Sequence, residues 1–305
     1  MGILDYHSGF FCLIRETSMS SNPPVVISAV STKGGVGKTT LIANLAGLMA
    51  DLGFRVLMVD ADVQPSLTKY YELEFENQAG IVELLLGENS VDNIQKCISS
   101  TKYQNLDIVI SNNITAEIQI KVQNRHDRAY LLKQKFMQPF FAENYDLILI
   151  DTQGAVGTLQ DTAAFASKVI LSPIKPEVLS AREFMTGTNE SLERLQQGRI
   201  MGLEVPLLRA IIYAHDRTRD SRLMSEEIKN HFKNLDGSRS LLETVVPMAK
   251  SYKESATLRM PVHCHEQTTT NKSESAYEIM HQLVYELFPM LKDQNIRASC
   301  FQDME

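Results

Sequence analysis

A glycine-rich loop between an apolar strand and a helix constrains this chain more than any other part of its sequence. Residues 25–31 read VVISAVS, which is typical of a buried strand, and residues 31–40 read STKGGVGKTT. After the loop, apolar residues recur at helical spacing up to Gly53, a residue type that commonly ends a helix. This order directs backbone N–H groups and a helix N-terminus at one point, which predicts a binding site for a phosphate chain.

The loop carries two lysines. It does not match the pattern G-x-x-x-x-G-K-[ST], because Thr32 stands where that pattern needs its first glycine, and Lys33 adds a positive charge at the entrance. We expect Lys38 to reach the β- and γ-phosphates and the Thr39 hydroxyl to ligate Mg²⁺. The glycines allow a close approach of the backbone. The candidate nucleotide-binding residues of the loop are Gly34, Gly35, Val36, Gly37, Lys38, Thr39 and Thr40.

The rest of the chain alternates β-branched runs with helical periods, which predicts an α/β fold. We expect a doubly wound, mostly parallel sheet with helices on both faces. Further strands are expected at RVLMVDAD, LDIVIS, YDLILID, KVILSPI, LRAIIYA and LETVVP. Helices are expected at GIVELLLG and over residues 115–141, 177–197, 221–232 and 273–288. We expect residues 23–290 to form a single domain, residues 1–22 to be a disordered extension or the product of an upstream start codon, and residues 291–305 to be a tail.

Carboxylates follow two of the expected strands. Asp60 and Asp62 lie two apart in VDADVQPS, so on a strand they share a face, although the turn at Pro65 lets Asp62 swing away. Asp151 ends the strand YDLILID, the usual position of a carboxylate that holds Mg²⁺ through a water molecule. Asp151 is therefore a candidate magnesium residue together with Thr39.

Composition limits the compartment and the partners. The formal net charge of −7 argues against binding of nucleic acid by bulk electrostatics, so a DNA contact must be regional. One such region is the basic patch, which we define as Arg217, Arg219, Arg222, Lys250 and Lys253; a solvated surface is the alternative. Four cysteines lie far apart without a C-x-x-C motif, which favours reduced thiols in the cytoplasm.

Two local clusters are left without a function. His263, Cys264 and His265 invite a metal assignment, but three adjacent side chains of an extended segment cannot all point at one ion, and no fourth ligand is evident. Tyr70 and Tyr71 are expected on the surface of a helix.

The segment from Lys33 to Thr39 fits K-G-G-x-G-K-[ST] and resembles the deviant P-loop ATPases that include ParA, MinD and the nitrogenase iron protein. The likeness to ParA/Soj-type partitioning ATPases extends over about residues 25–288. It implies ATP and Mg²⁺ as cofactors and an ATP-sandwich homodimer in which Lys33 reaches the nucleotide of the partner subunit. It also implies that Asp62 orients the attacking water, that Asp60 lies in the second shell of the magnesium, and that Ala214 and His215 lie beside the adenine.

The same resemblance implies partners. Members of this family bind DNA without sequence preference through basic residues of the C-terminal half, which here selects the basic patch, and a ParB-like partner stimulates hydrolysis on the nucleoid. The chain departs from the usual D-x-P-P motif with Asp151-Thr152-Gln153-Gly154, a variant similar to ParA-like proteins of integrating conjugative elements. That departure leaves the geometry of the second switch open.

Two other classes of ATPase share this loop. A MinD-like membrane-cycling ATPase needs a basic amphipathic helix at its C-terminus, whereas SESAYEIMHQLVYELF is acidic and is interpreted as a packing helix, so no membrane partner is expected. An electron-transfer ATPase like the nitrogenase iron protein needs paired cysteines, which Cys97 alone does not supply.

Overall fold

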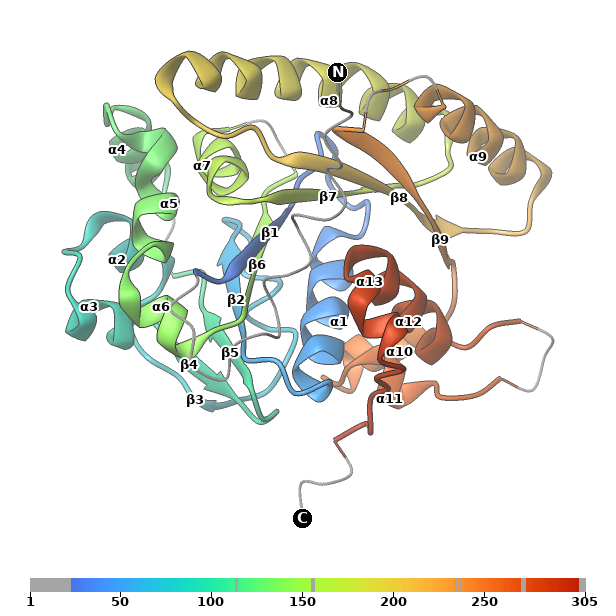
Figure 1. Cartoon of the computed structure of the whole chain (residues 1–305), viewed down its shortest axis with the longest axis horizontal. Helices are drawn as coiled ribbons and strands as arrows, with labels where there is room; N and C mark the ends of the chain where they lie inside the picture. Colours follow the sequence, from blue (N-terminus) through green and yellow to red (C-terminus); the bar gives the residue numbers. More distant parts are fainter. Residues whose placement is uncertain are drawn as a thin grey trace.

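A computed structural model describes residues 23–301 apart from 113–114, 155–156, 234, 236 and 270–272. In this part of the chain nine strands form one sheet in the order β3-β4-β5-β2-β6-β1-β7-β8-β9 (Figure 1). At one edge β3 pairs antiparallel with β4, and β4 pairs antiparallel with β5. All the pairs from β5 through β2, β6, β1, β7 and β8 to β9 are parallel. The predicted α/β fold with a mostly parallel sheet is confirmed.

The strands are short and joined mainly through helices. Their bounds are β1 (Val25–Ala29), β2 (Val56–Ala61), β3 (Leu73–Phe75), β4 (Ser99–Thr101), β5 (Leu106–Val109), β6 (Leu147–Thr152), β7 (Val169–Ile174), β8 (Leu207–His215) and β9 (Arg239–Pro247). The helices are α1 (Lys38–Asp51), α2 (Ile81–Leu86), α3 (Val91–Lys96), α4 (Ala116–Gln123), α5 (Leu131–Phe136), α6 (Pro139–Asn144), α7 (Thr158–Ala166), α8 (Val178–Gln197), α9 (Arg219–Phe232), α10 (Ser251–Thr257), α11 (Val262–His265), α12 (Ala276–Leu287) and α13 (Pro289–Asp293), with 3₁₀ turns η1 (Arg128–Tyr130) and η2 (Gly198–Met201).

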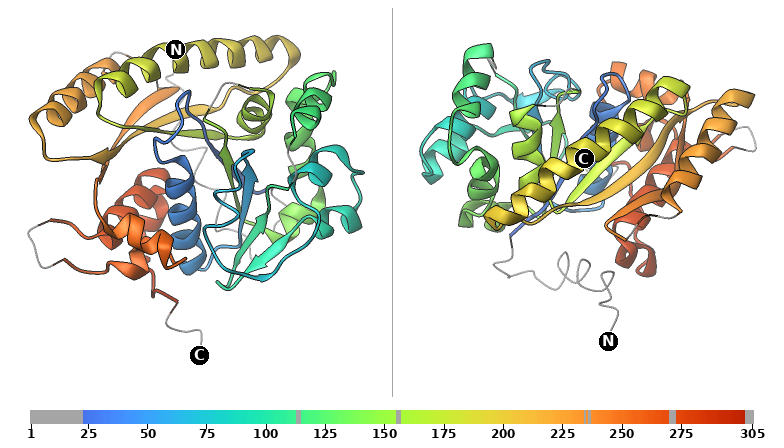
Figure 2. Two further views of the ribbon diagram at one scale, coloured as in Figure 1. Left: turned by 180° about the vertical axis from the view of Figure 1, so that it is seen from behind. Right: turned by 90° about the horizontal axis from the view of Figure 1, so that it is seen from above.

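Helices cover both faces of the sheet. Alternate residues of β6 enter different core clusters: Leu147 and Leu149 pack with α1 and α12, whereas Ile148 and Ile150 pack with α2, α5 and α7. The long helices α8 and α9 lie over β7 and β8 on the second face (Figure 2). Because each central strand is buried on both sides, its sequence is a continuous apolar run rather than an alternating one.

One predicted helix is wrong. The expected helix over residues 115–141 is divided into α4, η1, α5 and α6. Asn124 caps the C-terminus of α4, and Gln138 is extended before Pro139, as steric contact with the proline ring requires. The short strands β3 and β4, which sequence periodicity did not indicate, build the antiparallel edge.

The expectation for the tyrosine pair is also wrong. Tyr70 and Tyr71 are buried beside α1, where the Tyr71 hydroxyl donates to the Ala43 carbonyl at 2.8 Å and the Asn44 amide donates to the Tyr70 hydroxyl at 2.9 Å. They anchor the segment after β2 to α1.

The C-terminal part of the chain returns to α1. Helix α12 buries its apolar side chains against α1 and β9, so it is a packing helix as expected. After α13 the chain runs back to the end of α1, where the Phe301 N–H donates to Asp51 Oδ1 at 2.9 Å. None of the helices in the described ranges is long and apolar enough to cross a membrane.

Candidate nucleotide site

The glycine loop lies at the carboxyl edge of the sheet, between β1 and α1. Gly35 and Gly37 have positive φ angles of 71° and 103°, a region that favours glycine. A Cβ atom at Gly37 would overlap the ring of Tyr213, which closes one side of the loop from β8. The two glycines are therefore required by backbone conformation, and Gly37 also by the neighbouring ring.

Lys38 is the first residue of α1 and its side chain is buried beneath the loop. Its Nζ donates to the Ser31 hydroxyl at 3.1 Å, and the Ser31 hydroxyl donates to the Lys33 carbonyl at 2.7 Å. Burial lowers the pKa of Lys38, and the charges of Asp151 and Asp62 act in the opposite direction. An ammonium group that lacks bulk water gains most from a phosphate beside the loop.

Thr39 and Asp151 form the second polar contact of the site. The Thr39 hydroxyl donates to Asp151 Oδ2 at 2.5 Å, and Asp151 is fully buried. The other oxygen, Oδ1, has no hydrogen-bond partner among the described residues, and burial raises the pKa of this carboxyl to about 7. A hydroxyl beside a buried, unpartnered carboxylate oxygen suits Mg²⁺ and its water ligands, because hard cations prefer oxygen donors.

Asp60 is the neighbour of Asp151 across the β2–β6 ladder. It is also fully buried, and it accepts hydrogen bonds from the Thr68 N–H at 2.8 Å and the Thr68 hydroxyl at 2.7 Å. Burial raises the pKa of Asp60 to about 6. Asp60 and Asp151 lie side by side, and burial disfavours the charged form of both carboxyls. A divalent cation near them would therefore offset the electrostatic cost of two buried negative charges.

Asp62 lies beyond the end of β2 and is half-buried. Its Oδ1 accepts from the Gln64 N–H at 3.0 Å, which is the local turn expected before Pro65. The negative charge of Asp62 acts to raise the pKa of Lys38, so the two side chains are close enough to interact electrostatically.

Lys33 lies at the outer rim of the loop and is held apart from Lys38. Its Nζ donates to the Ser180 hydroxyl of α8 at 3.0 Å. On the inner side, Gly154 packs so closely that a Cβ atom there would lie 2.6 Å from the Gly34 Cα, which fixes the chain after β6 against the loop. The two lysines therefore have different surroundings: Lys38 is buried with carboxylates, and Lys33 is only partly covered, beside a helix that starts at the rim.

The candidate adenine residues lie at the end of β8, two strands from β1. Ala214 has a positive φ of 55°, and the His215 carbonyl accepts from the Met248 N–H at 2.8 Å. Sequence reasoning missed three residues that shape the loop: Tyr213, Ser31 and Gln160, whose amide donates to the Ser31 carbonyl at 2.9 Å. Ser31 was visible in the loop itself, whereas no local signal marks the other two.

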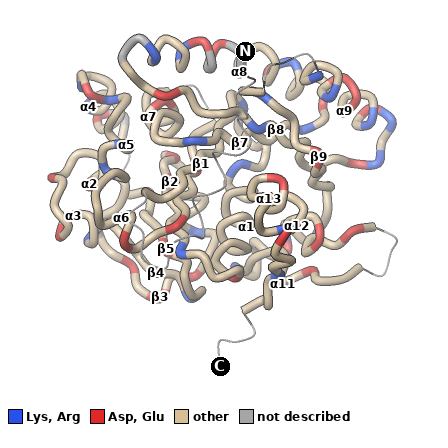
Figure 3. The backbone as a smooth tube through the Cα atoms, in the orientation of Figure 1, with Lys and Arg blue, Asp and Glu red and all other residues tan. Residues whose placement is uncertain are grey.

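The basic patch is exposed and lies at the same edge of the sheet. Its residues follow β8 and β9, which are neighbouring parallel strands, so both groups emerge at adjacent strand ends. None of the five residues forms an ion pair with a carboxylate in the described ranges. Acidic residues are interleaved with the arginines along α9 (Figure 3), so the positive charge is local.

Four features define a P-loop nucleotide-binding fold: a strand, a glycine loop with a buried lysine, a helix with a threonine in its first turn and a carboxylate on the neighbouring strand. A family model described as an AAA domain, AAA_31, matches residues 25–198. The chain belongs to this family and is an ATPase of the ParA/MinD type.

The relatives agree with this assignment. The chain is 30% identical to a putative replication protein A of Rhizobium rhizogenes over 184 residues, which cover 56% of this chain but only 46% of that relative. It is 26% identical to the chromosome partitioning protein ParA of Myxococcus xanthus, over 78% of this chain and 80% of that protein. Among solved structures, MinD of Pyrococcus horikoshii in complex with Mg-ADP has a TM-score of 0.65 at 21% identity and covers 89% of this chain and 98% of its own.

Proposed function

We propose that this protein binds ATP with Mg²⁺ and hydrolyses it as a partitioning ATPase. The observation that carries the proposal is the pair of lysines with separate surroundings, one buried under the loop and one at its rim. In this proposal Lys38 binds the β- and γ-phosphates of the nucleotide in its own subunit. The Thr39 hydroxyl and the waters held by Asp151 and Asp60 would complete the magnesium shell, and the cation would neutralise phosphate charge during transfer.

Lys33 is assigned to a second copy of the chain. In a dimer of facing subunits the triphosphates of the two bound nucleotides repel each other, and an additional ammonium group from each subunit reduces that repulsion. Among the described residues the Lys33 ammonium group contacts one hydroxyl, that of Ser180, and no carboxylate, so it can move to a phosphate without losing an ion pair there. The homodimer is therefore expected only with ATP bound, and Asp62 would orient the attacking water within it.

The dimer would bind DNA of any sequence through the basic patch and would be regulated by a ParB-like partner. A single patch on an acidic molecule has few phosphate contacts, and two patches on one dimer double them. Association with the nucleoid in the cytoplasm follows from this nucleotide-dependent binding. In this proposal residues 23–290 act as one ATPase domain, and Ala214 and His215 contact the adenine.

The test compares the two lysines. Lys38→Ala should abolish nucleotide binding, measured with a fluorescent ATP analogue, whereas Lys33→Ala should keep binding but neither dimerise in light scattering nor hydrolyse ATP. Lys121→Ala, an exposed lysine on α4 paired with Glu117, is the matched control and should behave as the parent. An ATP-dependent dimer of Lys33→Ala would refute the assignment of this residue to the partner subunit.

A further inference from the structure

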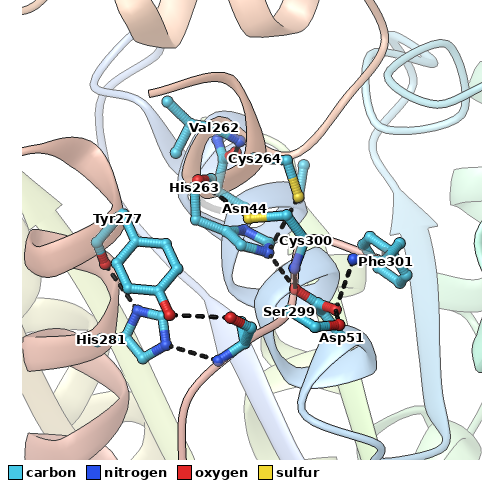
Figure 4. Close-up of polar contacts among 12 residues, drawn as sticks. Asn44, Asp51, Val262, His263, Cys264, Tyr277, His281, Ser299, Cys300 and Phe301 are labelled. Carbon is cyan, nitrogen blue, oxygen red and sulfur yellow. Dashed lines mark hydrogen bonds and ion pairs between the residues drawn. The ribbon is translucent and has the colours of Figure 1, made fainter. Parts of the chain in front are cut away.

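Four potential metal ligands from three distant parts of the chain meet at the end of α1, far from the nucleotide loop. They are Asp51, the last residue of α1, His263 and Cys264 of α11, and Cys300 of the C-terminal segment. Their ligand atoms all lie within 4.8 Å of one another (Figure 4). The expectation that residues 263–265 form an extended segment is wrong, because they lie in a helical turn that turns two of the three side chains towards one point.

The separations fit a tetrahedral ion. Zinc bonds of about 2.0–2.3 Å to nitrogen, oxygen and sulfur place neighbouring ligand atoms roughly 3.2–3.8 Å apart. Here His263 Nε2 lies 3.0 Å from Asp51 Oδ2 and 3.3 Å from Cys264 Sγ. Small adjustments of the side chains would bring all four atoms to bonding distance of one centre.

The electrostatics of the cluster also favour a cation. The Asp51 carboxylate is 1% exposed and the His263 ring 0%. Asp51 ends α1, where the helix dipole is negative, and its charge is stabilised there by hydrogen bonds from His263 and from two backbone N–H groups. The N–H groups of Cys300 at 2.7 Å and Phe301 at 2.9 Å donate to it, and they fix the C-terminal segment beside the two thiols.

We propose that Asp51, His263, Cys264 and Cys300 bind one zinc ion that fastens the C-terminal segment to the end of α1. Two thiolates, one imidazole and one carboxylate are a donor set that selects zinc, because thiolates are poor ligands for Mg²⁺ and Ca²⁺. All four positions are filled by protein, so the site is structural rather than catalytic. Binding replaces two thiol protons by the ion.

The neighbouring residues give the proposal its controls. His265 lies next to the cluster in sequence, but its Nε2 faces Glu254 Oε2 at 3.2 Å, away from the other ligands. Cys97 is buried in a different core cluster, on the second face of the sheet. Neither residue can ligate an ion held by Asp51.

The experiment measures zinc by elemental analysis in the full chain, reduced, supplied with zinc chloride and dialysed. We expect about one zinc per chain in the parent, in His265→Ala and in Cys97→Ser, and an affinity at least roughly tenfold weaker in His263→Ala, Cys264→Ser and Cys300→Ser. Cobalt(II) should give the parent a thiolate charge-transfer band and the intense visible bands of a tetrahedral ion, which tests the site without any substitution.

Three results would overturn the proposal. The first is a reduced parent that retains no zinc and shows no tetrahedral cobalt spectrum. The second is equal zinc retention in Cys264→Ser and His265→Ala. The third is intact mass that reveals a disulfide between Cys264 and Cys300 which persists when zinc and a reductant are supplied together, because the cluster is then a thiol pair and not a metal site.

Discussion

Asp151→Asn should stabilise the ligand-free protein while it damages magnesium binding. Asp151 is fully buried and its pKa is raised to about 7 from 3.8, chiefly by burial. An asparagine has the same shape and its amide oxygen can still accept from the Thr39 hydroxyl. The substitution therefore removes a buried charge and keeps the local hydrogen bond.

The size of this stabilisation follows from the shift in the pKa of Asp151. Because the folded state has the higher pKa, it binds the proton more tightly than the unfolded chain, so wild-type stability falls as the pH rises from about 4 to about 7. Roughly three pKa units at about 1.36 kcal/mol each give a cost near 4 kcal/mol at about pH 8, and about half of that at about pH 5.5. The advantage of Asp151→Asn should thus shrink by about 2 kcal/mol between those two conditions.

The assay is urea unfolding of both proteins in EDTA, without nucleotide, over a pH series. Asp62→Asn is the control, because that side chain is half-buried at the same edge and its removal relieves no comparable burial. Added Mg²⁺ and ATP should then raise the midpoint of the parent more than that of Asp151→Asn. Parallel stability curves for the parent and Asp151→Asn across the series would refute the idea that Asp151 carries this cost.

Three further outcomes are expected. Gly37→Ala should lower the free energy of unfolding by about 2–4 kcal/mol, because Gly37 has a positive φ and a Cβ atom there would overlap Tyr213. Gly34→Ala should change the free energy of unfolding by less than about 0.5 kcal/mol, because a Cβ atom there meets nothing within 4 Å. Comparable losses for the two variants in urea unfolding would contradict this reasoning. Asp62→Ala should accumulate ATP-bound dimers in light scattering because hydrolysis slows, and turnover at the parental rate would remove the residue from the chemistry. Mobility shifts on two unrelated duplexes should reveal ATP-dependent binding whose affinity falls with salt by a slope of about −0.9 per phosphate contact, and alanine at all five positions of the basic patch should abolish it; unchanged binding would exclude the patch.

The phosphate loop could be predicted from sequence because its structure is local. The strand, the glycines and the first turn of α1 follow one another along the chain, so their spacing fixes where Lys38 and Thr39 point. The same applies to Asp151, since parallel strands bring their carboxyl ends to one edge of the sheet. Its contact with Thr39 needs only the adjacency of β1 and β6.

Residues that act across the fold could not be predicted in this way. Tyr213 reaches Gly37 only because β8 is the second strand from β1, an order that the sequence pattern does not contain. The cluster of potential metal ligands could not be predicted either. Asp51 and Cys300 are remote in sequence from residues 263–265, so no fourth ligand is evident in the sequence, and a helical turn of four residues leaves no periodic signal that separates it from an extended segment.

Helix α1 separates the two sites that the structure suggests. It begins at Lys38 in the phosphate loop and ends at Asp51 in the metal cluster, a span of about 20 Å at 1.5 Å per residue. Residues 41–50 are all buried, so the helix is held in one position along its length. A zinc ion at the far end cannot touch the nucleotide, and its loss acts first on the packing of α11 and of the C-terminal segment. Removal of zinc is therefore expected to lower the free energy of unfolding and to leave the affinity for ATP nearly unchanged. The proposals for the two sites can therefore be tested independently of each other.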